Sequence, residues 1–256
     1  MIRFGYADTP FGQIHHASCG TGDPVLLLHQ TPRSWDEYRE VLPLLGRTRR
    51  AIAMDTLGFG NSAPPPRHTI EAYAAGVLAL MDALGLPEAA VAGHHTGGVV
   101  ALEVAAGAPE RVSRLVLSST PLVDHESRLR RKGRTPIDAA SEQPDGAHLA
   151  ELWNARAPYY PWRLLNRFVR DALTVLPEVE KGHEAVGAYR MEERAGLVRC
   201  PVLLVGAGQD PFALPELARL AAYFPGSMQA VIEDGVIPLE HQAAEFAAIV
   251  EDFLRA

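Results

Sequence analysis

The residues best suited to chemistry are two adjacent histidines in a turn of small residues, Gly-His-His-Thr-Gly-Gly at positions 93–98. An apolar run at residues 89–92 precedes this turn, and a helix-forming run follows it. Glycine two positions on each side of His95 permits a sharp strand-to-helix turn that pushes the central side chain out above a sheet. Neutral imidazole can attack an acyl carbon directly, because a reference pKa of about 6.5 leaves much of it unprotonated near neutral pH. It can also act as a general base or acid.

Other polar side chains follow short apolar runs. His29 comes after residues 24–28, and Asp210 comes shortly after residues 201–206. In open α/β sheets, sites form outside the carboxyl ends of the strands, so both side chains are candidates for the site, while the sequence leaves open whether Asp210 touches His95 directly. The carboxylate of Asp210 can support His95 as an acid, or it can instead cap the turn that follows it.

The elements that must position these residues alternate between strand and helix, which predicts a mostly parallel, doubly wound α/β sheet covered on both sides. Residues 2–17 predict an antiparallel hairpin, and Trp35, Tyr38, Leu42 and Leu45 recur at helical spacing. Residues 121–196 carry helical patterns without strands. We therefore predict a core at residues 1–120 and 197–256, with a helical cap inserted at 121–196. The expected core strands are 24–28, 50–55, 89–92, 115–117 and 201–206, and the expected core helices lie near 70–84, 99–106 and 246–254.

Several motifs in this order resemble the α/β-hydrolase fold family over nearly the whole chain. Residues 26–32, Leu-Leu-Leu-His-Gln-Thr-Pro, resemble its strand followed by His-Gly-x-Pro. Residues 55–62, Asp-Thr-Leu-Gly-Phe-Gly-Asn-Ser, resemble its D-x-x-G-x-G-x-S loop. The turn at 93–98 resembles its nucleophile elbow. Residues 206–210, Gly-Ala-Gly-Gln-Asp, resemble the strand end that supplies the catalytic acid.

The departures from that family pattern bear on function. His95 stands in place of the nucleophilic serine, and Gln30 replaces the glycine of the oxyanion loop. Val236 occupies the position where the resemblance places the general-base histidine, and His241 follows about one helical turn later, where we expect it to head the final helix. The ordinary Ser-His-Asp relay cannot be assembled from these positions, unless His241 folds back as a displaced base.

Three functions remain open at this point. The first is cofactor-independent hydrolysis of a small, partly apolar ester, lactone or related carbonyl compound, with His95 as nucleophile or general base. By the resemblance, the backbone N–H groups of Thr31 and Thr96 form the oxyanion hole. The second is a lyase or decarboxylase that works by acid–base chemistry, and the third is a non-catalytic small-molecule binder.

The resemblance also implies a pocket under the cap, since the caps of such hydrolases supply apolar walls. Asp124 is an alternative acid, because some members carry the acid at that place. The basic run at residues 128–134 forms either a solvated face or a site for an anionic substrate. The residues expected to line the substrate pocket are His29, Gln30, Trp35, His94, Asp124, Trp153, Tyr159 and Val236.

Composition narrows the classes of partner. Among 256 residues, 24 Lys and Arg stand against 31 Asp and Glu, a net charge of −7 that argues against a surface built for nucleic acid. No apolar run approaches the length of a membrane span, and the two cysteines make no disulfide framework. The glycines lack dinucleotide-binding spacing, and the histidines lack metal-ligand spacing. We expect no cofactor, no metal, no membrane or nucleic-acid partner, a cytoplasmic location, and a monomer or homodimer.

Overall fold

The computed structural model describes residues 1–133, 138, 140–176 and 178–256, and it is built on one eight-stranded sheet. The strand order is β1-β2-β4-β3-β5-β6-β7-β8. The hairpin of β1 and β2 runs antiparallel, β2 also pairs antiparallel with β4, and every later pairing is parallel. The strands are β1 (Arg3–Thr9), β2 (Gly12–Cys19), β3 (Pro24–Leu28), β4 (Arg50–Met54), β5 (Ala89–His94), β6 (Val112–Ser118), β7 (Val202–Ala207) and β8 (Met228–Ile232).

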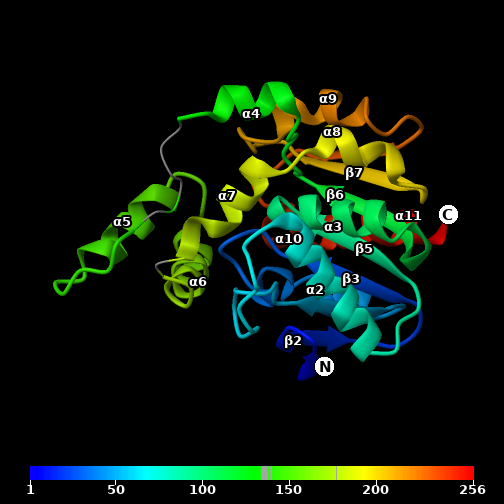
Figure 1. Ribbon diagram of the computed structural model, residues 1–256, viewed down its shortest axis with the longest axis horizontal. Helices are drawn as coiled ribbons and strands as arrows, with labels where there is room; N and C mark the ends of the chain where they lie inside the picture. Colours follow the sequence, from blue (N-terminus) through cyan, green and yellow to red (C-terminus); the bar gives the residue numbers. More distant parts are fainter. Residues whose placement is uncertain (134–137, 139, 177) are drawn as a thin grey trace.

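Helices cover both faces of this sheet, as the alternation predicted. Helices α2 (Ile70–Ala83) and α3 (Thr96–Gly107) pack together on one face, and α1 (Leu42–Leu45) contacts α11 (Ala243–Arg255) on the other (Figure 1). The central strands are buried along nearly their whole length because they are covered from both sides. The short helix α9 (Leu217–Ala221) packs on β7, and α10 (Pro238–His241) packs on α11.

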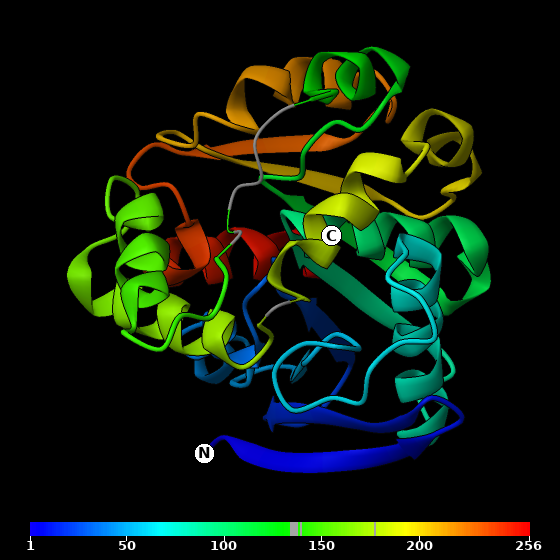
Figure 2. The same ribbon diagram turned by 60° about the vertical axis from the view of Figure 1, so that its left-hand side comes forward.

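The insertion after β6 contains helices joined by loops, and no strand lies among its described residues. It contains α4 (His125–Arg131), α5 (Ala147–Arg156), α6 (Trp162–Leu173), α7 (Lys181–Ala188) and α8 (Met191–Arg194). Figures 1 and 2 show α5 and α6 as a group standing beside the sheet, while α7 leads back to the core. Helix α8 packs on α3, so the end of the predicted cap segment is continuous with the core layer.

Two local predictions differ from the structure. The helical spacing over residues 35–45 is divided between the 3₁₀ turn Trp35–Tyr38 and α1, whose second residue is a proline. Proline has no N–H to donate and fits only the first turn of a helix, which explains a new start here. His241 does not head the last helix, since it ends α10. No helix in the described part of the chain is long and apolar enough to cross a bilayer.

Candidate active site

The turn at His95 joins β5 to α3 without a connecting loop. His95 has φ 46° and ψ −115°, a conformation that residues with a side chain rarely adopt. A Cβ atom at Gly93 would overlap the backbone of Gly97, and one at Gly97 would overlap the carbonyl of Leu28. These glycines therefore allow the chain to turn tightly against the end of β3. Such backbone strain is typical of a residue held in place for function.

His95 contacts a carboxylate directly. Its Nε2 atom lies 3.0 Å from Oδ2 of Asp210, which follows β7. The other carboxylate oxygen, Oδ1, accepts hydrogen bonds from the backbone N–H groups of Phe212 (2.8 Å) and Ala213 (3.2 Å). Burial alone would raise the pKa of Asp210, but His95 and these two N–H groups outweigh it and hold the pKa below its ordinary value. Asp210 is therefore a fixed anion that both caps its turn and orients the imidazole.

The position of the expected general base holds no titratable side chain. Val236 is half-buried, and its backbone N–H donates to Nδ1 of His241 at 3.3 Å. Burial lowers the pKa of His241, which favours its neutral form. Within the described part of the chain, no hydrogen bond or ion pair joins His241 to His95 or Asp210. Among the described residues, His95 thus contacts Asp210 directly, and no third side chain forms a relay with them.

Two backbone donors lie beside His95. Leu28 pairs with Gly93 in the parallel register of β3 and β5, so the chain leaving β3 passes the turn at His95. The Oγ1 atoms of Thr31 and Thr96 are 2.9 Å apart, and both residues line the same cavity as His95. Neither backbone N–H of this pair has an acceptor among the described residues. Thr31 and Thr96 therefore each offer an unpaired backbone donor next to His95, as the resemblance to the family implies.

Gln30 connects this loop to a buried carboxylate and to the cap. Its backbone N–H donates to Oε2 of Glu37 at 2.9 Å, and its Nε2 donates to Oε1 of Glu37 at 2.5 Å. The same Nε2 donates to the hydroxyl of Tyr160 at 3.2 Å. Burial is the main reason that the pKa of Glu37 is raised to about 8. The side chain of Gln30, which stands where the family has glycine, is therefore held by Glu37 on one side and by Tyr160 on the other.

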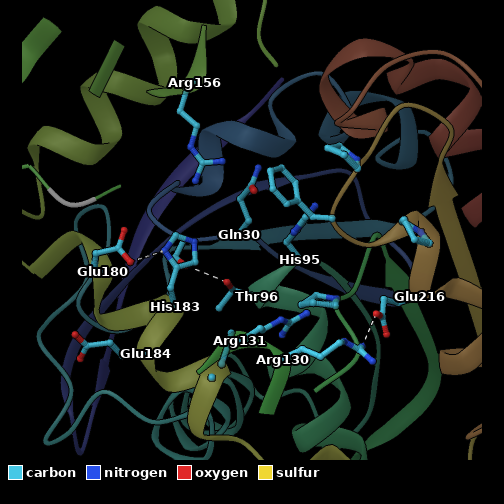
Figure 3. Close-up of a pocket in the computed structure, with 17 residues that line it drawn as sticks. Gln30, His95, Thr96, Arg130, Arg131, Arg156, Glu180, His183, Glu184 and Glu216 are labelled. Atoms are coloured by element: carbon cyan, nitrogen blue, oxygen red, sulfur yellow. Dashed lines mark hydrogen bonds and ion pairs between the residues drawn. The ribbon is translucent and has the colours of Figure 1, made fainter. Parts of the chain in front are cut away.

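The cavity above His95 has a volume of about 730 Å³, which suits a small molecule. Gln30, His95 and Thr96 line one side of it (Figure 3), together with Thr31. Helices of the insertion and the loop after β7 form the walls. The wall residues include Arg130, Arg131, Arg156, Glu180, His183, Glu184 and Phe212.

Several residues predicted for the pocket lie outside its lining, for identifiable reasons. His29 is buried, and its ring bonds the carbonyl of Gln30 and the N–H of Thr56. His94 is fully buried, with Nδ1 3.0 Å from Oγ of Ser118. Trp35 packs edge-on against Phe4 on the hairpin.

The remaining predicted residues support neighbouring elements. Asp124 caps α4 by accepting from the N–H of Ser127, and it pairs with Arg219, so it is not directed at His95. Tyr159 stacks edge-on behind Phe212, one layer outside the cavity. Trp153 is half-buried against the apolar core, and Val236 also lies outside the lining.

Charged wall residues from the insertion were missed by sequence reasoning, apart from Arg130 and Arg131 in the basic run. Among the described residues, one group has the composition of a metal site: Asp138, Glu180 and His183, with donor atoms within 4.8 Å of one another. Both carboxylate oxygens of Asp138 already bind Arg156. That guanidinium supplies the positive charge that a cation would otherwise provide. Glu180 and His183 are three residues apart, but Asp138 comes from a distant segment, so no sequence spacing signals the group of three.

Comparisons with known proteins agree with this architecture. A family model described as the alpha/beta hydrolase fold matches residues 23–172. Bifunctional epoxide hydrolase 2 of Rattus norvegicus is 33% identical over 129 residues, which make up 48% of this chain and 23% of that protein. The 2-hydroxy-6-oxo-2,4-heptadienoate hydrolase of Pseudomonas putida is 37% identical over 112 residues, 42% of this chain and 41% of that protein. The matched stretches therefore span less than half the length of these relatives.

Structural comparison extends the likeness to the whole chain. The enol-lactonase from Burkholderia xenovorans LB400 has a TM-score of 0.81 at 22% identity, covering 98% of this chain and 100% of that one. E-2-(Acetamidomethylene)succinate hydrolase has the same TM-score at 17% identity, covering 100% of both chains. At these identities the likeness concerns the fold. Together with the family model, which covers more than half of the chain, it shows that the chain belongs to the α/β-hydrolase fold family.

Proposed function

We propose that the protein hydrolyses a small, partly apolar ester, lactone or related carbonyl compound without a cofactor, using His95 as the reacting group. The observation that carries this proposal is the 3.0 Å contact between Nε2 of His95 and Oδ2 of Asp210, beside the cavity that His95 lines. A carboxylate beside one ring nitrogen favours the tautomer with the proton on that nitrogen. The lone pair is then on Nδ1, which has no hydrogen-bond partner among the described residues.

As nucleophile, Nδ1 attacks the carbonyl carbon, and the carbonyl electrons move to the oxygen held by the N–H groups of Thr31 and Thr96. Collapse of this adduct breaks the bond to the leaving oxygen, which takes a proton from solvent. Water then attacks the acyl-imidazole, releasing the acid and restoring neutral His95. As general base, Nδ1 instead takes a proton from water during attack and returns it to the leaving oxygen. Asp210 stabilises the charged imidazolium in either route.

The test is hydrolysis of nitrophenyl esters of increasing chain length by the wild type, His95→Ala and His125→Ala. His125 is exposed at the start of α4, so it controls for loss of a histidine outside the cavity. We expect turnover by the wild type and by His125→Ala, and a loss of about 10³-fold or more in kcat/KM for His95→Ala. Equal activity of His95→Ala and the wild type contradicts the proposal.

The two routes are separated in the first turnover. A covalent route with slow deacylation releases a burst of nitrophenol equal to the enzyme concentration, and acid quenching preserves an acyl adduct whose mass maps to the peptide containing His95. A base-only route gives linear product release and no adduct. If no ester is hydrolysed, but a ligand raises the melting temperature and is recovered unchanged, the cavity is a binding site and the hydrolase proposal is wrong.

A further inference from the structure

The side chain of Gln30 has one hydrogen-bonding group left over after its contacts with the protein. Its Nε2 donates to both Glu37 and Tyr160, so the amide nitrogen is occupied. Its Oε1 accepts nothing from the described residues and is not sealed within the interior. Because Gln30 lines the cavity beside His95 (Figure 3), the amide presents an acceptor to whatever is bound there.

The contacts of Gln30 hold the amide in this orientation. Both oxygens of Glu37 accept from Gln30, one from the backbone and one from the side chain. Glu37 is itself fully buried, 3.7 Å from the guanidinium of Arg33. Turning the amide over would direct its oxygen at the carboxylate of Glu37, which has no proton to donate when it is ionised. The acceptor is therefore fixed on the cavity side while Glu37 is charged.

The acceptor lies next to the carbonyl-binding donors. Gln30 directly precedes Thr31, whose N–H forms the oxyanion hole together with Thr96 in the proposed function. With the carbonyl oxygen held by Thr31 and Thr96, we expect a group on the neighbouring carbon to face the Gln30 side of the cavity. The N–H groups of Thr31 and Thr96 bind the substrate's carbonyl oxygen in the proposed function, so they do not donate to Oε1 of Gln30. Oε1 therefore needs a hydrogen-bond donor that the substrate itself carries.

We infer that Gln30 selects substrates with a hydroxyl group on the carbon next to the reacting carbonyl, the hydroxyl donating to Oε1. This inference rests on the proposed function for the position of the carbonyl, and it makes Gln30 a specificity-determining residue of that site. A site that hydrogen-bonds a substrate hydroxyl discriminates strongly against the analogue lacking it, because its own polar group is left unpaired.

The test compares ethyl 2-hydroxybutyrate with ethyl 2-methylbutyrate, in which a methyl group replaces the hydroxyl, and with ethyl 2-methoxybutyrate, which keeps the oxygen but has no donor. Assays run at pH 9, above the raised pKa of Glu37, so that its carboxylate is ionised. For the wild type we expect kcat/KM to be at least about 10-fold higher for the hydroxy ester than for either analogue. In Gln30→Met the ratio falls to about one. The same exchange at exposed Gln229 on β8 leaves the ratio unchanged.

Failure of this inference is distinguishable from failure of the hydrolase proposal. If the wild type hydrolyses the esters without preference, Gln30 does not select the hydroxyl and only the inference is wrong. If no ester is hydrolysed, the hydrolase proposal fails, and calorimetry with 2-hydroxybutyramide and 2-methylbutyramide tests the site by binding. Tighter binding of the hydroxy amide to the wild type, lost in Gln30→Met, supports the inference. Equal binding, or binding of neither amide, contradicts it. Circular dichroism of Gln30→Met shows whether the variant is folded.

Discussion

Exchange of Asp210 for asparagine is the most informative change near His95, because it keeps the size of the side chain. The asparagine oxygen can still accept from the N–H groups of Phe212 and Ala213. Its NH₂ group then faces Nε2 of His95, which must accept instead of donate. The ring proton moves to Nδ1, and the atom facing the substrate loses its lone pair.

The size of the effect follows from the lost contact. A hydrogen bond to a charged group contributes about 1.5–3 kcal/mol, or roughly 10- to 150-fold in rate. The wrong tautomer adds to this loss, and in a Ser-His-Asp triad the same exchange lowers kcat by about 10⁴. We therefore expect Asp210→Asn to lower kcat/KM by about 10² to 10⁴.

The assay is steady-state hydrolysis of the best nitrophenyl ester, with Asp252→Asn on the exposed side of α11 as the matched control. An activity of Asp210→Asn within threefold of the wild type would refute the role given to this carboxylate.

The pH dependence of the unfolding free energy supplies a second check on Asp210. The folded pKa of Asp210 is lowered, so its ionised form stabilises the fold above about pH 4 and this contribution is lost as pH falls through the folded pKa. The difference in unfolding free energy between Asp210→Asn and the wild type should shrink over that range in urea titrations.

Three further changes test the surrounding structure. The double variant His95→Ser, Val236→His should restore a Ser-His-Asp triad and react with a fluorophosphonate probe to which the wild type is inert. If the folded double variant is not labelled, residue 236 does not lie beside Asp210. Gly182→Ala places a Cβ within 2.6 Å of Oγ1 of Thr31, which must then shift. We expect a lower kcat because Thr31 belongs to the proposed oxyanion hole, and a loss of about 1–3 kcal/mol in the free energy of unfolding. Unchanged kinetics would count against that contact. Arg33→Met removes the buried guanidinium that pairs with Asp171 and Glu240, and leaves them Arg170 and Arg167 as cationic partners among the described residues. We expect this change to cost about 3–5 kcal/mol in urea unfolding, whereas an unchanged midpoint would show that these ion pairs do not stabilise the fold.

The sequence predicts the core well, because local patterns determine it. Strands buried on both faces appear as short apolar runs, and the turn at His95 is marked by glycines whose absent side chains permit the approach to Leu28. The family to which the chain belongs was also identified from the order of such motifs. The sequence also predicts that no titratable side chain stands at Val236. Comparison of that one loop with the family motif is enough for this prediction.

The walls of the cavity could not be predicted in the same way. Whether Asp210 reaches His95 depends on the spacing of β5, β6 and β7 and not on a local pattern. Arg156 and His183 line the cavity because α5 and α7 pack where they do, and nothing in their local sequence signals it. Conversely, Trp35 is a large aromatic near a site motif, yet it covers Phe4 on the hairpin.

The central claim is that His95 and Asp210 act as one unit. A double-mutant cycle on kcat/KM with His95→Ala and Asp210→Asn tests it most directly, because the losses from residues that act together do not add. We predict that Asp210→Asn causes a large loss in the wild type and no further loss once His95 is alanine. Equal losses from Asp210→Asn in both backgrounds would contradict the account, since Asp210 would then act independently of His95.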